Sequence, residues 1–123
     1  MKIEVSNGEI IDKLTILEIK LEKITDEEKL TNIRKEHAIL SESAQPILDR
    51  ADPLYQKLYE INRKLWDIED RCREFESKKD FGPEFIATVR KVYVFNDERA
   101  DIKKRINVKT GSDLTEEKSY EKY

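Results

Sequence analysis

The 123-residue sequence contains one cysteine, Cys72, and one histidine, His37. A single cysteine excludes a disulfide framework and a cysteine-based zinc site, and a single histidine excludes metal motifs that need a histidine pair. No motif indicates a bound metal or cofactor, and we expect neither. A chain so poor in cysteine is typical of a reducing compartment, which predicts a cytoplasmic protein.

Long apolar runs are also absent. No segment approaches the ~20 consecutive apolar residues that would cross a bilayer. The first five residues, Met1–Val5, lack the apolar stretch of a secretory signal. We therefore expect no interaction with a membrane.

Neither sign of charge is in large excess: 24 Lys and Arg face 27 Asp and Glu, for a net charge of −3. Binding of duplex DNA requires a surplus of basic side chains on one face, so this balance argues against a nucleic-acid partner. Charged residues make up 41% of the chain, and only three glycines and three prolines interrupt it. This composition favours long helices with charged surfaces.

Local signals predict where the helices begin. Ser6 and Glu9 form a capping box, in which the Ser6 hydroxyl accepts a hydrogen bond from the Glu9 amide and the Glu9 carboxylate reaches back. Further start and stop signals are Asp52-Pro53, Pro83 and Gly111. The expected helices span residues 7–24, 26–43, 53–77 and 83–108.

Within these segments, apolar residues recur at steps of three and four, most regularly over residues 54–75. The pattern predicts a single all-α domain covering residues 1–123, either an antiparallel bundle or a long helical hairpin. Residues 2–5 alternate as in a very short strand. Residues 114–123 are expected to form a short C-terminal helix or a tail.

The last expected helix changes character along its length. The face that begins with Phe85, Val89 and Val92 continues through polar and cationic residues, namely Asn96, Arg99, Lys103 and Asn107. Cations on a packed face are costly unless they are paired or solvated, so one interpretation is a pocket for a phosphate or carboxylate ligand. On that interpretation, Arg99→Ala should hardly change the stability of the unliganded protein. The other interpretation is that the helix extends beyond the core and its last turns are simply solvated.

A second stripe on the expected helix 53–77 carries aromatic and polar residues together. Its members step by three and four: Tyr55, Tyr59, Asn62, Trp66, Glu69 and Arg73. Tyrosine and tryptophan suit a half-buried groove wall or a partner interface. The stripe is therefore either a second packing face of a central helix or, from Asn62 to Arg73, part of the same ligand site.

No motif assigns an enzymatic reaction. Phosphate-binding glycine loops and nucleophile elbows are missing. Carboxylate pairs occur at Glu9–Asp12 and at Glu18–Glu22, but the E-x-x-E motif of helical nucleotide pyrophosphohydrolases does not. His37 and Cys72 lie on apolar stripes and are expected to be buried structural residues.

A family resemblance rests on four segments: VSNGEIIDKLTILEIKLEKI, INRKLWDIED, FNDERADIKKRIN and TGSDLTEEKSY. Through them the chain resembles, from Ile3 to Tyr123, a family of small uncharacterised helical proteins of bacteria and tailed phages. The resemblance implies one intact domain and no catalytic roles. Some members occur near surface-polysaccharide biosynthesis genes, which implies an accessory role there.

These observations favour a small interaction or assembly module that associates with itself or with a protein partner through its long charged helices. The alternative is a small enzyme or binding protein for an anionic metabolite.

Overall fold

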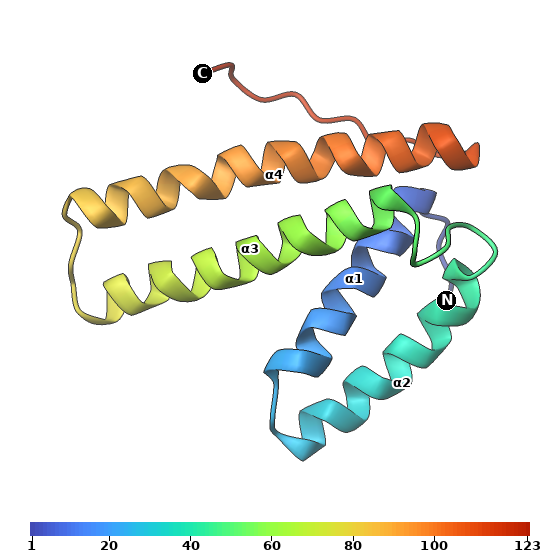
Figure 1. Cartoon of the computed structure of the whole chain (residues 1–123), viewed down its shortest axis with the longest axis horizontal. Coiled ribbons are helices and arrows are strands. Elements are labelled where there is room, and N and C mark those ends of the chain that lie inside the picture. Colours follow the sequence, from blue (N-terminus) through green and yellow to red (C-terminus); the bar gives the residue numbers. More distant parts are fainter.

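The computed structural model describes all 123 residues and contains four helices and no strand (Figure 1). The helices are α1 (Asn7–Lys23), α2 (Glu27–Ala44), α3 (Pro53–Ser77) and α4 (Pro83–Thr110). The prediction of a single all-α domain is confirmed. No helix is both long enough and apolar enough to cross a membrane.

The helix starts follow the capping residues of the sequence. Ser6 Oγ accepts a hydrogen bond from the Glu9 amide at 3.2 Å, as the capping box predicts. The Glu9 carboxylate, however, does not return to Ser6, because it binds Lys103 instead. Asp52 caps α3 ahead of Pro53, and Gly111 ends α4 with a left-handed φ of 65°.

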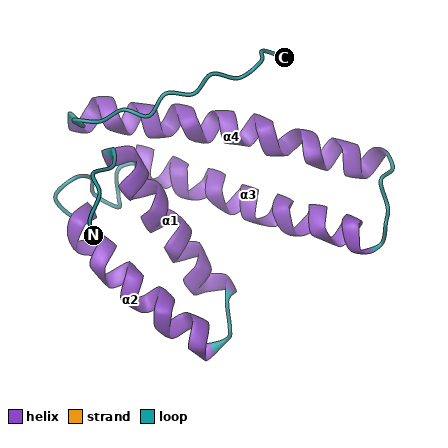
Figure 2. Cartoon of the chain, turned by 180° about the vertical axis from the view of Figure 1, so that it is seen from behind, coloured by secondary structure: helices purple, strands orange, loops and turns teal.

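The four helices form two antiparallel hairpins, α1–α2 and α3–α4, which lie across one another (Figure 2). Helix α1 is the element that joins them, because it packs against α2, α3 and α4. Among the helices, α2 packs against α1 alone. The loop end of the α3–α4 hairpin extends well beyond the α1–α2 hairpin (Figure 1).

The hydrophobic core lies where the hairpins cross. It draws residues from every helix and from the turn between α2 and α3: Ile11, Leu14, Ala44, Leu48, Tyr55, Leu58, Ile61, Ile102 and Ile106. Because Ile102 and Ile106 belong to it, the C-terminal half of α4 is the half that the fold buries. The interpretation that this half is a solvated helix end is therefore wrong.

Both ends of the chain differ from the expectations. Residues 1–6 form no strand and are largely exposed. Residues 114–123 form no helix but run as an extended tail along α4 (Figure 1). Side chains hold this tail in place. Lys104 pairs with Glu117 at 3.1 Å, and Tyr123 Oη donates to Asp97 at 2.6 Å.

Candidate functional site

The start of α1 is anchored on the end of α4. The Asn7 amide donates to Ser112 Oγ at 3.0 Å, and the Gly8 amide donates to Asn107 Oδ1 at 2.6 Å. The first amides of a helix have no partner within it, so Asn107 of α4 and Ser112, just after α4, supply the acceptors that α1 lacks. A Cβ on Gly8 would lie 2.5 Å from the Lys103 carbonyl oxygen. Only glycine therefore permits this approach of the two helices.

One turn further along α1, Asp12 lies at the centre of a buried polar cluster. Its side chain is 1% exposed. Arg99 binds it with two parallel hydrogen bonds, Nε to Oδ1 at 2.9 Å and Nη2 to Oδ2 at 2.5 Å. Asn62 Nδ2 donates to Asp12 Oδ1 and to Thr15 Oγ1, both at 2.9 Å. A bidentate arginine–carboxylate pair of this kind has strict geometry, so it fixes α1 relative to α4.

Lys103 occupies the neighbouring position, one helical turn after Arg99. Its Nζ lies 2.7 Å from Glu9 Oε2, 3.3 Å from Glu116 Oε2 and 3.9 Å from Asp12 Oδ2. Glu116 belongs to the C-terminal tail, so this lysine also fastens the tail. We call the set of side chains that meet here the polar junction: Glu9, Asp12, Thr15, Asn62, Arg99, Lys103 and Asn107.

The ionisation of the polar junction follows from its contacts. The hydrogen bonds to Asp12 raise the pKa of Arg99, although burial opposes this shift. Burial alone would lower the pKa of Lys103, but the hydrogen bond with Glu9 and the charges of Asp12 and Glu116 outweigh it and leave the pKa above its usual value. Both cations are therefore firmly charged at neutral pH, and each has its counter-charge inside the chain.

The polar junction is thus satisfied within the protein. No buried side-chain nitrogen or oxygen lacks a hydrogen-bond partner. Paired charges of this kind are costly to break and gain little by binding a further ion. The arrangement locks two hairpins together and holds the tail, and it leaves no free positive charge.

A hollow of about 600 Å³ lies beside the junction, between α4 and the tail. Three of the residues predicted for an anion site line it: Asn96, Arg99 and Lys103. Asn107 is not among its lining residues, because its side chain binds the start of α1. The remaining wall includes Tyr93 and Tyr123, whose rings meet edge to face at 5.1 Å between centroids.

The other predicted residues lie elsewhere. Asn62 belongs to the polar junction. Trp66 is half-buried, and Glu69 and Arg73 form an exposed pair along α3 at 2.8 Å. The stripe on α3 is a packing face in its first half, because its side chains bind α1. In its second half, from Trp66 to Arg73, its side chains make no hydrogen bond or ion pair with α1.

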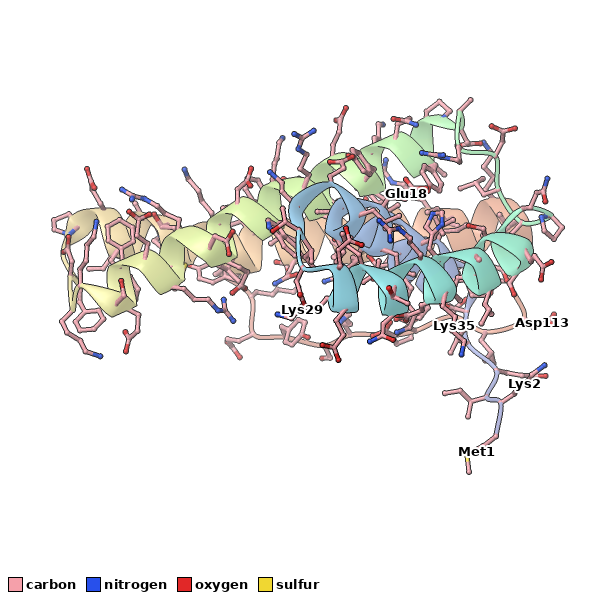
Figure 3. The ribbon with its side chains drawn as sticks, turned by 90° about the horizontal axis from the view of Figure 1, so that it is seen from below. Met1, Lys2, Glu18, Lys29, Lys35 and Asp113 are labelled. Atoms are coloured by element: carbon pink, nitrogen blue, oxygen red, sulfur yellow. The ribbon has the colours of Figure 1, made fainter.

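A second buried cluster was missed by the sequence analysis. Its centre is Glu18, which is labelled in Figure 3. The Glu18 carboxylate accepts hydrogen bonds from Tyr55 Oη at 2.7 Å and from Arg50 Nη2 at 3.2 Å, and His37 Nε2 lies 3.7 Å away. Burial and the Glu18 carboxylate raise the pKa of Tyr55. His37, expected to be buried, is half-exposed at the rim of a hollow of about 300 Å³.

Two residue pairs with the same spacing in the sequence could have indicated this second cluster. Glu18 and Glu22 are spaced by four residues on α1, and Tyr55 and Tyr59 have the same spacing on α3. Tyr55 binds Glu18 and Tyr59 binds Glu22, so the pairs form two successive rungs between the helices. Likewise, the carboxylates of Glu9 and Asp12 match the cations of Arg99 and Lys103. No group of three or more His, Cys, Asp or Glu side chains is arranged to hold a metal ion.

Fold and site together define a class: a small all-α protein whose two helical hairpins are joined at their crossing by a buried polar junction. The family model described as "Family of unknown function (DUF6165)" matches residues 1–123, and the chain belongs to that family. No curated protein and no solved structure matches the chain.

Proposed function

We propose that this protein is a self-associating assembly module that uses the projecting end of its α3–α4 hairpin. We call this end, residues 66–96, the distal arm. The observation that carries the proposal is the exposure of large apolar side chains there: Phe81 49%, Ile86 56%, Tyr93 42% and Val94 37%. Apolar groups gathered on a projecting element are typical of an interaction surface.

The distal arm has this surface because only two helices build it. Helix α1 reaches only the start of the arm, where Lys23 pairs with Asp67 at 3.7 Å, and α2 packs against α1 alone. Two helices cannot enclose their own apolar stripes, so Phe85, Val89 and Val92 stay half-buried. Phe75 is the one buried phenylalanine of the chain, and Phe85 contacts its ring edge to face at 6.0 Å. Pairing with other helices would cover the remaining apolar area.

A second copy of this chain is the partner we propose. The distal arm contains nearly equal numbers of acidic and basic residues, so two arms meet without net repulsion. The resemblance to proteins linked with surface-polysaccharide biosynthesis supplies the setting that we propose for such a module, an accessory role in the cytoplasm.

The polar junction favours this function over the binding of an anionic metabolite. An anion site needs cationic donors that are free to turn toward the ligand. Arg99 and Lys103 already hold carboxylates on both α1 and the tail. The hollow also includes the carboxylates of Asp97 and Glu121 in its lining.

The test is the mass of the full chain in solution, measured by light scattering over a wide range of concentration. The mass should rise from 14.6 kDa toward twice that value as the concentration increases. Ile86→Asp should weaken association because it places a charge on the distal arm. The matched control is Ile39→Asp on α2, where the isoleucine is 59% exposed, and it should leave association unchanged. A wild-type protein that stays monomeric at every concentration contradicts the proposal.

A further inference from the structure

The outer face of α4 carries an unusual arrangement of charge around Val94. Two basic residues, Arg90 and Lys91, precede it, and two acidic residues, Asp97 and Glu98, follow it. The basic residues thus lie three and four positions before Val94, and the acidic residues lie three and four positions after it. All four charged side chains, and Val94 between them, are exposed.

These charges have almost no partners within the chain. Arg90, Lys91 and Glu98 make no side-chain hydrogen bond and no ion pair. The Asp97 carboxylate accepts one hydrogen bond, from Tyr123 Oη. Nearby charges on the same helix behave differently, because Arg105 pairs with Asp101 at 2.9 Å and Lys104 pairs with Glu117 at 3.1 Å. Three of the four residues around Val94 thus have no side-chain partner, and the fourth, Asp97, keeps capacity to accept further hydrogen bonds.

Helical geometry places them in two rows. At about 100° per residue, Lys91 and Glu98 both lie about 50° to one side of Val94, and Arg90 and Asp97 lie about 50° to the other side. When two copies of a helix pair antiparallel, each row faces the same row of the partner. In each row the cation precedes the anion along the chain, so in an antiparallel pair the cation of one copy lies opposite the anion of the other.

We propose that two copies associate through the outer face of α4 in antiparallel orientation, with the two-fold axis at Val94. Lys91 of one copy then meets Glu98 of the second copy, and Arg90 meets Asp97 of the second copy. The two-fold axis repeats both contacts, which gives four ion pairs around a central contact between the two Val94 side chains. This inference rests on the proposed function, because it specifies the register in which a second copy pairs with the α4 side of the distal arm and with the two residues that follow it, Asp97 and Glu98.

The charge order selects the antiparallel arrangement. In a parallel, in-register pair, Arg90 and Lys91 would face the same cations of the second copy, and Asp97 and Glu98 would face the same anions. Like charges that face one another are destabilising, so the wild-type sequence opposes that arrangement. The pairs lie at the surface, so association should also weaken as salt is added.

Charge reversal tests the register. The all-acidic variant Arg90→Glu/Lys91→Glu and the all-basic variant Asp97→Lys/Glu98→Lys should each self-associate roughly 10- to 100-fold more weakly than the wild type, because all four pairs become repulsive. The matched control for the all-acidic variant is Lys29→Glu/Lys35→Glu, which makes the same change of net charge on α2 (Figure 3). It should leave the dissociation constant unchanged.

Mixing the variants distinguishes a specific register from a general effect of charge. The all-acidic and all-basic variants, mixed in equal amounts, should form a heterodimer with an affinity near that of the wild type. A chain that carries all four reversals should again form a homodimer. That chain should not pair with the wild type, since in the antiparallel register each of its rows repels the corresponding row.

The outcomes distinguish the proposed self-association from the proposed antiparallel register. If the wild type dimerises and Ile86→Asp weakens its dimer, but neither charge reversal does, the register is wrong and the proposed function stands. A heterodimer between the wild type and the four-reversal chain overturns the antiparallel orientation. A wild type that is always monomeric overturns the proposed function and the register together.

Discussion

The Gly8 amide hydrogen and the Asn107 side-chain oxygen form a hydrogen bond of 2.6 Å that joins positions 99 residues apart. The contact exists because Gly8 has no side chain. It brings the first turn of α1 onto the backbone of α4, directly beside the Lys103 carbonyl. This close approach places Asp12 and Glu9 opposite the cations Arg99 and Lys103 of α4.

Gly8→Ala should destabilise the protein, although alanine is normally the better helix former. The added Cβ would lie 2.5 Å from backbone, which must shift. We expect a loss of about 1–3 kcal/mol in the free energy of unfolding, measured by chemical denaturation. The control is Gly82→Ala, whose Cβ meets only the flexible Asp80 side chain at 3.3 Å and should have a small effect. A Gly8→Ala variant as stable as the wild type, or more stable, would show that helix propensity, rather than the close approach, governs position 8.

Arg99→Ala should be strongly destabilising without any ligand present, which reverses the expectation drawn from the sequence. The substitution leaves the Asp12 carboxylate buried without its main counter-charge. Breaking a buried pair from one side costs about 3–5 kcal/mol. Thermal and chemical unfolding measure the change. Arg73→Ala removes an exposed pair on α3 and should cost no more than about 0.5 kcal/mol, so a similar loss in both variants would contradict this account.

Tyr55→Phe should alter the dependence of stability on alkaline pH. The pKa of Tyr55 is raised in the folded state by burial and by Glu18. A raised pKa means that folding favours the protonated phenol, so the stability it contributes is complete below pH about 10 and is lost as the pH rises further. Lys103 titrates in the same range, and the difference between wild type and variant isolates the tyrosine.

At neutral pH the same variant should lose about 1–3 kcal/mol, because Glu18 loses a hydrogen-bond donor. Tyr59→Phe is the comparison, since its partner Glu22 is exposed, and it should lose less. If the stabilities of the wild type and Tyr55→Phe fall in parallel above pH 10, the role assigned to Tyr55 is wrong.

The C-terminal tail should detach in acid while the helices remain folded. The charge of Lys103 lowers the pKa of Glu116, so the tail contact is complete above the ordinary glutamate range and is lost as the pH falls through the lowered value. Heteronuclear NMR relaxation of residues 113–123 measures the detachment. Glu116→Gln should show a mobile tail already at neutral pH, whereas Glu121→Gln should not, because Glu121 has no ion pair. A tail that stays rigid in Glu116→Gln would assign its docking to other contacts.

The sequence predicts the helices better than it predicts the site. Ser6, Asp52-Pro53 and Pro83 act locally, so the beginnings of α1, α3 and α4 could be found without knowing the fold. The crossing of the hairpins depends on contacts between residues far apart in the chain. Periodicity marks Arg99 and Lys103 as cations on a packed face, but it does not reveal that Asp12 and Glu9 come to meet them.

The same limit explains which part of α4 was misjudged. Phe85, Val89 and Val92 are apolar, so the sequence predicts that this half of α4 is packed. It predicts that the polar half, which carries Arg99 and Lys103, faces solvent or a ligand. In the structure the polar half is the buried one, because α1 brings matching carboxylates to it. The apolar half lies in the distal arm, where no third helix follows. The hydrophobic pattern of the sequence therefore predicts which residues form an apolar surface, but it does not predict whether another part of the chain covers that surface.

The link between Gly8 and Asn107 also orders the folding of the chain. Helix α1 begins at Asn7, yet three of its first residues, Gly8, Glu9 and Asp12, find partners on residues 99–107. Contacts of such long sequence separation form late and slow the folding rate. During synthesis, Asp12 therefore stays in water until residues 99–107 have left the ribosome.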